Sequence, residues 1–297
     1  MNPKLSVVIA SVNGGKSLAD CIASLEQQKH GDDIEIVVCE SFDDAVAKDT
    51  HAQFPNVRFF HFGERKSIPE LRVTGILNAR GDVIALTEDH CIVHEHWMAS
   101  VLSAHTSPYL VIGGAVENAA TERLIDWAVF FCEYGRYMFP IVPGAIKDLP
   151  GPNVSYKRAV LENFRDVFAT AAWEPFWHSR LMNAGVTLFS DPGLIVYHRK
   201  NFALGGFLRE RFYYARSFAG ERVKDVSWIY RVMYICGAPF LSPLLFSRIV
   251  VAVWRKHRKQ RELILSLPYI FLFTLIWSLG EFIGYVAGQG NSLGKVE

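Results

Sequence analysis

Short apolar runs alternate with helical stretches along the first hundred residues of the chain. The runs at residues 5–10, 34–39, 57–61 and 83–86 are typical of buried strands. The stretches at 18–28, 68–79 and 94–105 are typical of helices. Strands that alternate with helices in this way indicate βαβ units. We therefore predict an α/β fold with a mostly parallel sheet and flanking helices.

The pattern changes in the last seventy residues, where two long apolar segments occur. Residues 228–254 are apolar apart from two arginines and a few serines, and residues 263–287 contain one acid, Glu281. A helix of about 20 residues crosses the hydrocarbon core of a membrane, and the second segment has that length. The first segment contains Pro239 and Pro243, which break or kink a helix. The tail is therefore predicted to form membrane-associated helices.

The charges around these segments constrain their topology. The loop at residues 255–261 is rich in Arg and Lys, and the positive-inside rule places it in the cytoplasm. Residues 5–10 are too short for the apolar part of a signal peptide, so the N-terminal α/β part is also expected in the cytoplasm. A full crossing by residues 228–254 would put the loop outside. We therefore predict a re-entrant or interfacial first segment and a second segment that crosses.

The segment at 204–227 interleaves aromatic residues with arginines. This composition suits an amphipathic helix at a lipid headgroup interface, although a linker helix packed on the catalytic domain would look similar. The predicted division is therefore a catalytic domain at 1–203, an interfacial helix at 204–227 and membrane helices at 228–297. Within the last, Glu281 is costly unless paired, with Arg231 or Arg248 or with a lipid phosphate.

Composition excludes some classes of protein. The 297 residues include 31 Lys and Arg against 30 Asp and Glu, so the net charge of +1 gives no support for nucleic-acid binding. The five cysteines form no CxxC pair, which favours reduced, buried thiols over disulfides or zinc.

Acidic residues follow the apolar run at 83–86. Glu88 and Asp89 come at the carboxyl end of this predicted strand, where ligands of open α/β sheets bind. Carboxylates at such an edge suit Mg²⁺ or Mn²⁺, so Asp89 is the candidate metal ligand with Glu88 beside it; a solvated turn is the alternative. His198 follows the apolar run 194–197 and is a candidate further metal or phosphate contact, or a structural histidine.

Polar residues also follow the first two predicted strands. Ser11 and Asn13 follow the first strand, and Glu40 and Ser41 follow the second. Because parallel strands end at one edge, these four are candidates for contacts to a nucleotide, unless they are ordinary loop polarity. Arg72, on the helix predicted at 68–79, could add positive charge for a diphosphate.

Two further motifs are candidates for the acceptor side and the base. Glu174 lies in the sequence between Trp173 and Trp177, and a carboxylate among large apolar groups could act as a general base; it could also be a surface residue at a helix start. Asn153 stands in a Gly/Pro-rich loop at 149–156 that could approach a ligand closely or be a tight connection. Asn153, Trp173 and Trp177 are the candidate acceptor-binding residues.

Taken in order, these pieces resemble a known family. The matching stretches are Ser6–Asn13, Glu35–Ser41, Leu71–Gly75, Gly81–Asp89, Gly151–Arg158 and Trp173–Gly185. Together they resemble the family 2 glycosyltransferases, which have the Rossmann-like GT-A fold, over about residues 4–200. The tail, with residues 216–219 and 280–285, is similar to that of membrane-attached members that build bacterial surface polysaccharides.

The resemblance implies inverting transfer from a nucleotide-diphosphate sugar to a lipid-linked saccharide or polysaccharide, with Mg²⁺ or Mn²⁺. It implies that Asp89 fills the last position of the family's Asp-x-Asp motif and that Glu174 is the catalytic base. It also implies a cell inner membrane protein with a cytoplasmic catalytic domain. The chain departs from the pattern at Thr87, in place of the first Asp of the motif, and at Cys39, where an acidic pair is usual.

The sequence is also compatible with other functions. Transfer to a polyprenyl phosphate would need no base, because a phosphate is already ionised. A nucleotidyltransferase can share the fold and the acidic metal site, and a membrane scaffold could carry a degenerate transferase domain. A Rossmann dehydrogenase is disfavoured, because no G-x-G-x-x-G follows the first predicted strand.

Overall fold

The computed structural model describes residues 2–28 and 33–296, and the chain forms two compact units. The first unit comprises residues 1–117 and 139–199, and the second comprises residues 118–138 and 200–297.

A nine-stranded sheet forms the centre of the first unit, and one half of it is parallel. This half has the order β3-β2-β1-β4, and its strands are β1 (Leu5–Ser11), β2 (Ile34–Glu40), β3 (Arg58–His61) and β4 (Val83–Glu88). Ser11 pairs with Glu40, and Ala10 pairs with Glu88. The carboxyl ends of β1, β2 and β4 therefore meet at one edge of the sheet.

The other half of the sheet is antiparallel, and its order from β4 is β8-β6-β9-β5, with β7 on β9. These strands are β5 (Cys91–Val93), β6 (Val111–Asn118), β7 (Gly144–Ile146), β8 (Val154–Lys157) and β9 (Leu188–His198). Cys91 pairs with His198, so β9 ends beside the turn that follows β4. The α/β fold class and the four predicted strands are confirmed.

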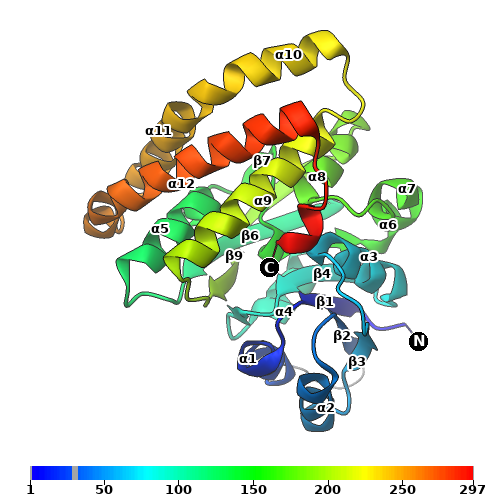
Figure 1. Ribbon diagram of the computed structural model, residues 1–297. Helices are drawn as coiled ribbons and strands as arrows, with labels where there is room; N and C mark the ends of the chain where they lie inside the picture. The colour runs from blue at the N-terminus through cyan, green and yellow to red at the C-terminus, as the bar shows by residue number, and fades with distance from the viewer. Residues whose placement is uncertain (1, 29–32, 297) are drawn as a thin grey trace. The chain divides into compact units, whose positions relative to one another are not determined.

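Helices flank the sheet (Figure 1), and three of them, α1, α3 and α4, correspond to the predicted helices, whereas α2 was not predicted. The first four are α1 (Gly15–Glu26), α2 (Asp44–Gln53), α3 (Ile68–Asn78) and α4 (Trp97–Ala104). After β8 come α6 (Arg158–Asn163), α7 (Arg165–Phe168) and α8 (Glu174–Asn183), and a 3-10 turn, η3 (Gly151–Asn153), precedes β8. Of these helices, α3 and α8 supply residues to the site described below.

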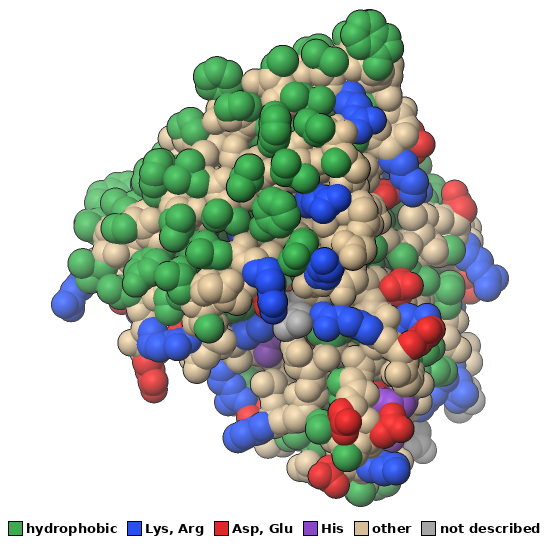
Figure 2. Space-filling model, viewed as in Figure 1, with side chains coloured by type: hydrophobic (Ala, Val, Ile, Leu, Met, Phe, Trp, Pro, Cys, Tyr) green, Lys and Arg blue, Asp and Glu red, His purple; other side chains and the backbone are tan. Residues whose placement is uncertain are grey.

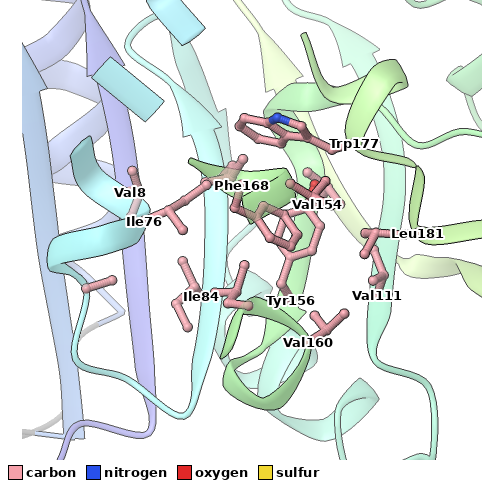
Figure 3. Close-up of a cluster of buried hydrophobic side chains, with 14 of the residues drawn as sticks. Val8, Ile76, Ile84, Val111, Val154, Tyr156, Val160, Phe168, Trp177 and Leu181 are labelled. Atoms are coloured by element: carbon pink, nitrogen blue, oxygen red, sulfur yellow. The ribbon is translucent and has the colours of Figure 1, made fainter. Parts of the chain in front are cut away.

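A buried apolar cluster holds α8 against the sheet. Ile84 of β4, Tyr156 of β8 and Trp177 of α8 are fully enclosed, and Figure 3 shows Trp177 with Phe168 beside Tyr156. The Tyr156 hydroxyl and His178 lie 3.1 Å apart, and the other ring nitrogen of His178 is 2.7 Å from Asp148. Apolar burial and this polar chain together set the position at which α8 begins.

Gly75 allows α3 to approach the sheet closely. A Cβ at this position would overlap a methyl group of Val8 and lie 3.4 Å from Cys39 Sγ. The start of α3 is held by a capping box, in which Ser67 and Glu70 bond each other's backbone. The close packing and the cap together position Arg72, one turn before Gly75.

The second unit is helical. Its elements are α5 (Leu124–Glu133), η2 (Gly135–Tyr137), α9 (Leu204–Arg222), α10 (Trp228–Gly237), η4 (Ala238–Phe240), α11 (Leu241–Trp254), α12 (Gln260–Ala287) and η5 (Leu293–Lys295). α12 lies alongside α5, α9 and α11 (Figure 1). The predicted interfacial helix at 204–227 corresponds to α9, which ends at Arg222.

Small residues bring α9 and α12 together. A Cβ at Gly280 would lie 2.8 Å from Ala215 Cβ, and a Cβ at Gly284 would lie 2.7 Å from Ala219 Cβ. Every fourth residue of α9 from Phe207 to Ala219 is buried. These residues form the seam that faces α12.

Glu281 has partners, but they differ from those expected. Its carboxylate lies 3.2 Å from Arg222 of α9, and it accepts hydrogen bonds from Trp277 Nε1 at 2.6 Å and from Tyr285. The expected partners were Arg231 or Arg248. Instead, Arg231 of α10 donates to the backbone oxygen of Tyr285, and the arginine that reaches the Glu281 carboxylate is Arg222 of α9.

Two helical segments are long and apolar enough to cross a membrane, at Trp228–Trp254 and Gln260–Ala287. The first is interrupted by η4, which contains Pro239, so the predicted break in this segment is confirmed. Large apolar side chains of both segments are exposed, and they include Trp228, Phe240 and Phe271. Figure 2 shows such side chains gathered over α10, α11 and α12.

Candidate active site

Polar side chains of the first unit meet at the edge where β1, β4 and β9 end. Glu88 is the last residue of β4, His198 is the last of β9, and His90 lies in the turn between β4 and β5. One ligand atom from each of these three residues lies within 4.8 Å of the others. We call Glu88, His90 and His198 the metal cluster.

The metal cluster has the donors of a transition-metal site. His90 Nε2 lies 3.2 Å from a Glu88 carboxylate oxygen and 2.9 Å from His198 Nε2. Two imidazoles and one carboxylate suit Mn²⁺ better than Mg²⁺, because Mg²⁺ prefers oxygen ligands. The donor atoms therefore fit a divalent ion, and Mn²⁺ better than Mg²⁺.

Asp89 contacts the metal cluster through His90. One of its carboxylate oxygens is 2.7 Å from His90 Nδ1, and the other accepts a hydrogen bond of 2.6 Å from Ser11. Ser11 in turn accepts one from the Gly14 backbone. A carboxylate on the far nitrogen of a ligating histidine fixes the orientation of the ring. The sequence predicted Asp89 and His198 as the metal ligands. The geometry instead groups His198 with Glu88 and His90, and Asp89 contacts His90.

Thr87, which stands at the first Asp position of the Asp-x-Asp motif, is not one of the residues of the metal cluster. Its side chain is buried, and its hydroxyl oxygen has no hydrogen-bond partner among residues 2–28 and 33–296. The residue that completes this site is instead His90. Its signal in the sequence is its position directly after two acids, and an Asp-x-Asp pattern does not include that position.

The protonation of the metal cluster reflects its opposite charges. Burial alone lowers the pKa of His90, but hydrogen bonds to Asp89 and Glu88 raise it to about 9. Burial alone raises the pKa of Glu88, but its hydrogen bond to His90 and the charges of His90, Arg72 and His198 lower it well below its usual range. In the metal-free protein, the Glu88 carboxylate is therefore ionised and His90 carries a positive charge.

Arg72 joins the metal cluster to Glu174. One nitrogen of its guanidinium lies 2.8 Å from Glu88, and another lies 2.5 Å from Glu174 Oε1. A Cβ at Gly151 of η3 would be 3.1 Å from Glu174 Oε2 and 3.3 Å from Arg72. The loop predicted to approach a ligand closely therefore approaches this ion pair, and the glycine leaves room for it.

The Glu174 carboxylate is buried, and one of its two oxygens is paired with Arg72. Glu174 begins α8, and only 4% of the residue is exposed. Oε1 binds Arg72, whereas Oε2 accepts no hydrogen bond from the part of the chain that the structure describes. Oε2 is therefore the oxygen that can accept a proton from a substrate.

The predicted nucleotide-binding residues lie at the ends of β1 and β2. The Ser41 backbone nitrogen donates to Ser11 O, and Ser41 Oγ bonds the backbone at Glu64 and Lys66. Asn13 is exposed in the turn after β1. These positions border the same sheet edge as the metal cluster.

Glu40, the fourth predicted nucleotide contact, is enclosed by two histidines. One of its oxygens lies 2.6 Å from His51 Nε2 and 3.0 Å from His61 Nδ1. Burial alone lowers the pKa of His61, but hydrogen bonds to Asp44 and Glu40 raise it. The sequence pattern did not predict either histidine, because they come from α2 and β3 and approach Glu40 only in the fold.

The three predicted acceptor-binding residues lie in the interior. Asn153 accepts a hydrogen bond from Trp97 and donates to the backbone oxygens of Ala115 and Leu194. Trp177 is 0% exposed, and Trp173 is also buried. The structure gives Asn153 and Trp177 roles in packing, and a contact of the three with an acceptor stays a prediction.

Comparison with known proteins agrees with this architecture. The sequence profile of Glycosyl transferase family 2 matches residues 6–165, which is more than half of the 297 residues. The chain therefore belongs to glycosyltransferase family 2. The matched range contains most of β1 and all of β2, β3, β4, the acidic strand end and η3, so the resemblance to family 2 is confirmed. The stretch around Glu174 and the tail lie outside this range.

Two individual proteins are similar to the chain over different extents. Polypeptide N-acetylgalactosaminyltransferase 12 of Mus musculus is 28% identical over 137 residues, which are 43% of this chain and 23% of that protein. The chain thus spans about a quarter of the length of this curated relative. The solved structure of the mannosyltransferase PcManGT from Pyrobaculum calidifontis, in complex with GDP-Man and Mn²⁺, has a TM-score of 0.59 at 12% identity. The match covers 95% of this chain and 87% of that one, and it shows a shared fold.

Proposed function

We propose that this protein is a membrane-associated, inverting glycosyltransferase. It moves a sugar from a nucleotide-diphosphate sugar to a hydroxyl group of a lipid-linked saccharide or a growing polysaccharide. The observation that carries the proposal is the continuous series of contacts that runs from Ser11, through Asp89 and the metal cluster, to Arg72 and Glu174. A cation site and a carboxylate base thus lie on the two sides of one arginine.

The donor end of this series suits a diphosphate. Glu88, His90 and His198 would hold the divalent ion, with Asp89 orienting His90. The bound ion supplies Lewis-acid stabilisation of the negative charge on the departing nucleoside diphosphate. Ser11, Asn13, Glu40 and Ser41 lie at the adjoining strand ends, where a nucleoside binds in open α/β sheets.

The other end of the series suits an acceptor hydroxyl. Glu174 Oε2 takes the hydroxyl proton as the acceptor oxygen attacks the anomeric carbon, while Arg72 holds Oε1 and so fixes the direction of the carboxylate. A single displacement by an activated hydroxyl inverts the configuration at the anomeric carbon, as it does in inverting glycosidases. Arg72 also supplies positive charge beside Glu88.

The second unit supports a membrane location. Its long apolar segments expose large side chains, and the loop between them is basic. Apolar helices flanked by Arg and Lys are the pattern of membrane-embedded segments with a cytoplasmic loop. We place the protein in the cell inner membrane with its catalytic unit in the cytoplasm, and its acceptor on a lipid carrier.

A donor screen tests the transferase function. Membranes that contain the protein should release a nucleoside diphosphate from one nucleotide sugar among a panel, and only with a divalent ion. Chelation should abolish the release, and Mn²⁺ should restore it more fully than Mg²⁺, because two of the three donors are imidazoles. Release of pyrophosphate would indicate a nucleotidyltransferase instead. The product's anomeric configuration, read by NMR, tests inversion.

Cysteine labelling tests the topology. A single accessible cysteine placed at position 257, in the loop at residues 255–261, should react with an impermeant reagent only in inverted vesicles, because the basic loop stays in the cytoplasm. Exposed Cys236 should first be replaced by serine, so that it does not add a background signal. Labelling of the loop from outside intact cells would contradict the re-entrant first segment.

A further inference from the structure

Arg211 is a buried cation in the seam between α9 and α12. It stands one turn after Phe207 and one turn before Ala215, at a position where the neighbours in this stripe are apolar. Only 7% of the residue is exposed. Its position therefore resembles that of a core residue, although its side chain carries a full charge.

The guanidinium of Arg211 has no anionic partner among residues 2–28 and 33–296. Its Nε is enclosed without a hydrogen-bond acceptor. Among the described residues, the guanidinium contacts the face of Trp277, whose ring centre lies 4.1 Å from Arg211 Cζ. The acid nearest in sequence to Trp277 on α12 is Glu281, which is bound to Arg222 and accepts the Trp277 N–H.

The burial of Arg211 without a counter-ion is energetically unfavourable. An arginine cannot lose its proton in a protein, so Arg211 cannot relieve the burial by becoming neutral. A buried charge that lacks a counter-ion is far more unfavourable than one cation–π contact can offset. An anion that accepts hydrogen bonds from the remaining donors of Arg211 would therefore stabilise the folded protein, and the described residues do not supply one.

We propose that Arg211, backed by the face of Trp277, is a binding site for a phosphate group. The planar fork of a guanidinium matches the oxygens of a phosphate, and stacking on an indole leaves the edge of the fork free to donate. The phosphate comes from a lipid headgroup or from free phosphate. The site lies wholly in the second unit, and it does not depend on the proposed transfer reaction.

Thermal unfolding of the full chain, purified in detergent, tests this proposal. Inorganic phosphate should raise the Tm of the wild type by about 2–6 °C over chloride at equal ionic strength, because a ligand that binds only the folded state stabilises it. Arg211→Gln should abolish this shift and should unfold at or above the wild-type temperature without phosphate, because it removes a buried unpaired charge. Arg209→Gln is the matched control, because Arg209 is exposed on the same helix, and it should keep the full shift.

A second variant covers the case in which Arg211→Gln does not fold. Arg211→Lys keeps the charge but loses the fork, so the phosphate concentration for half of the Tm shift should rise about tenfold. Dihexanoyl phosphatidic acid separates the two sources of phosphate. A shift at much lower concentration than with inorganic phosphate indicates a lipid headgroup, and an equal response indicates free phosphate. A wild type that responds to neither probe, or an Arg211→Gln protein with the full shift, overturns the proposal.

Discussion

Replacing Glu174 by glutamine should lower turnover with a hydroxyl acceptor by about 10²–10⁴-fold, because the variant loses its general base. The amide keeps an oxygen for Arg72 and nearly the same volume. Alanine would instead leave Arg72 with a buried, half-unpaired charge, which destabilises a protein by about 3–5 kcal/mol. The measurement is kcat for transfer to the acceptor, with release of nucleoside diphosphate as the readout.

Two controls make this result specific. Glu162→Gln, an exposed acid on α6, should leave turnover unchanged. Donor binding and the Tm of Glu174→Gln should stay close to those of the wild type, because the ion pair to Glu88 still holds Arg72. Turnover close to normal in Glu174→Gln would show that the acceptor is already ionised, and the polyprenyl-phosphate alternative would then replace the hydroxyl acceptor.

Replacing His90 by alanine should lower metal-dependent turnover by about 10²–10³-fold, because Lewis-acid stabilisation by a bound ion contributes several kcal/mol. Asp89→Ala should act less directly. It loses the group that orients His90, so the Mn²⁺ concentration for half-maximal turnover should rise about 10–100-fold, and saturating Mn²⁺ should restore much of the activity. Titrations of turnover against Mn²⁺ distinguish the two variants.

His96→Ala is the control for this comparison, since His96 is a histidine on the same segment whose side chain is 76% exposed. It should titrate with Mn²⁺ as the wild type does. If Asp89→Ala abolishes turnover at all Mn²⁺ concentrations while His90→Ala titrates normally, Asp89 is itself the ligand, as the Asp-x-Asp resemblance implies. If both titrate normally, the ion binds elsewhere.

The parallel half of the fold follows from local sequence. The apolar runs at 5–10, 34–39 and 83–86 are continuous, as expected for strands buried on both faces, and each became a strand of the sheet. Short strands such as Cys91–Val93 have no comparable signal, because three residues are too few to show a period. The shortest strands of the antiparallel half were therefore not predictable in this way.

Candidate acids were predictable because strand ends and family motifs mark them. Asp89, Glu88 and Glu174 stand at such positions, and the structure brings them into one network. Trp177 shows the opposite case. An aromatic residue beside a candidate base could line a pocket or fill a core, and its local sequence is the same in both cases; the packing of α8 on β8 buries it completely.

The sequence by itself determined the family, the order of the parallel strands and helices, and the positions of the carboxylates, because these depend on periodicity and on motifs a few residues long. The tertiary structure alone decided which groups meet. His90 contacts His198, which is 108 residues away in the sequence, and Arg72 contacts Glu174, which is 102 residues away. Arg222 likewise pairs with Glu281, which is 59 residues away. Such contacts depend on how helices and strands pack, and packing is a property of surfaces formed by distant segments. For the same reason, only the fold shows that Arg211 is buried without a counter-ion in the part of the chain that the structure describes.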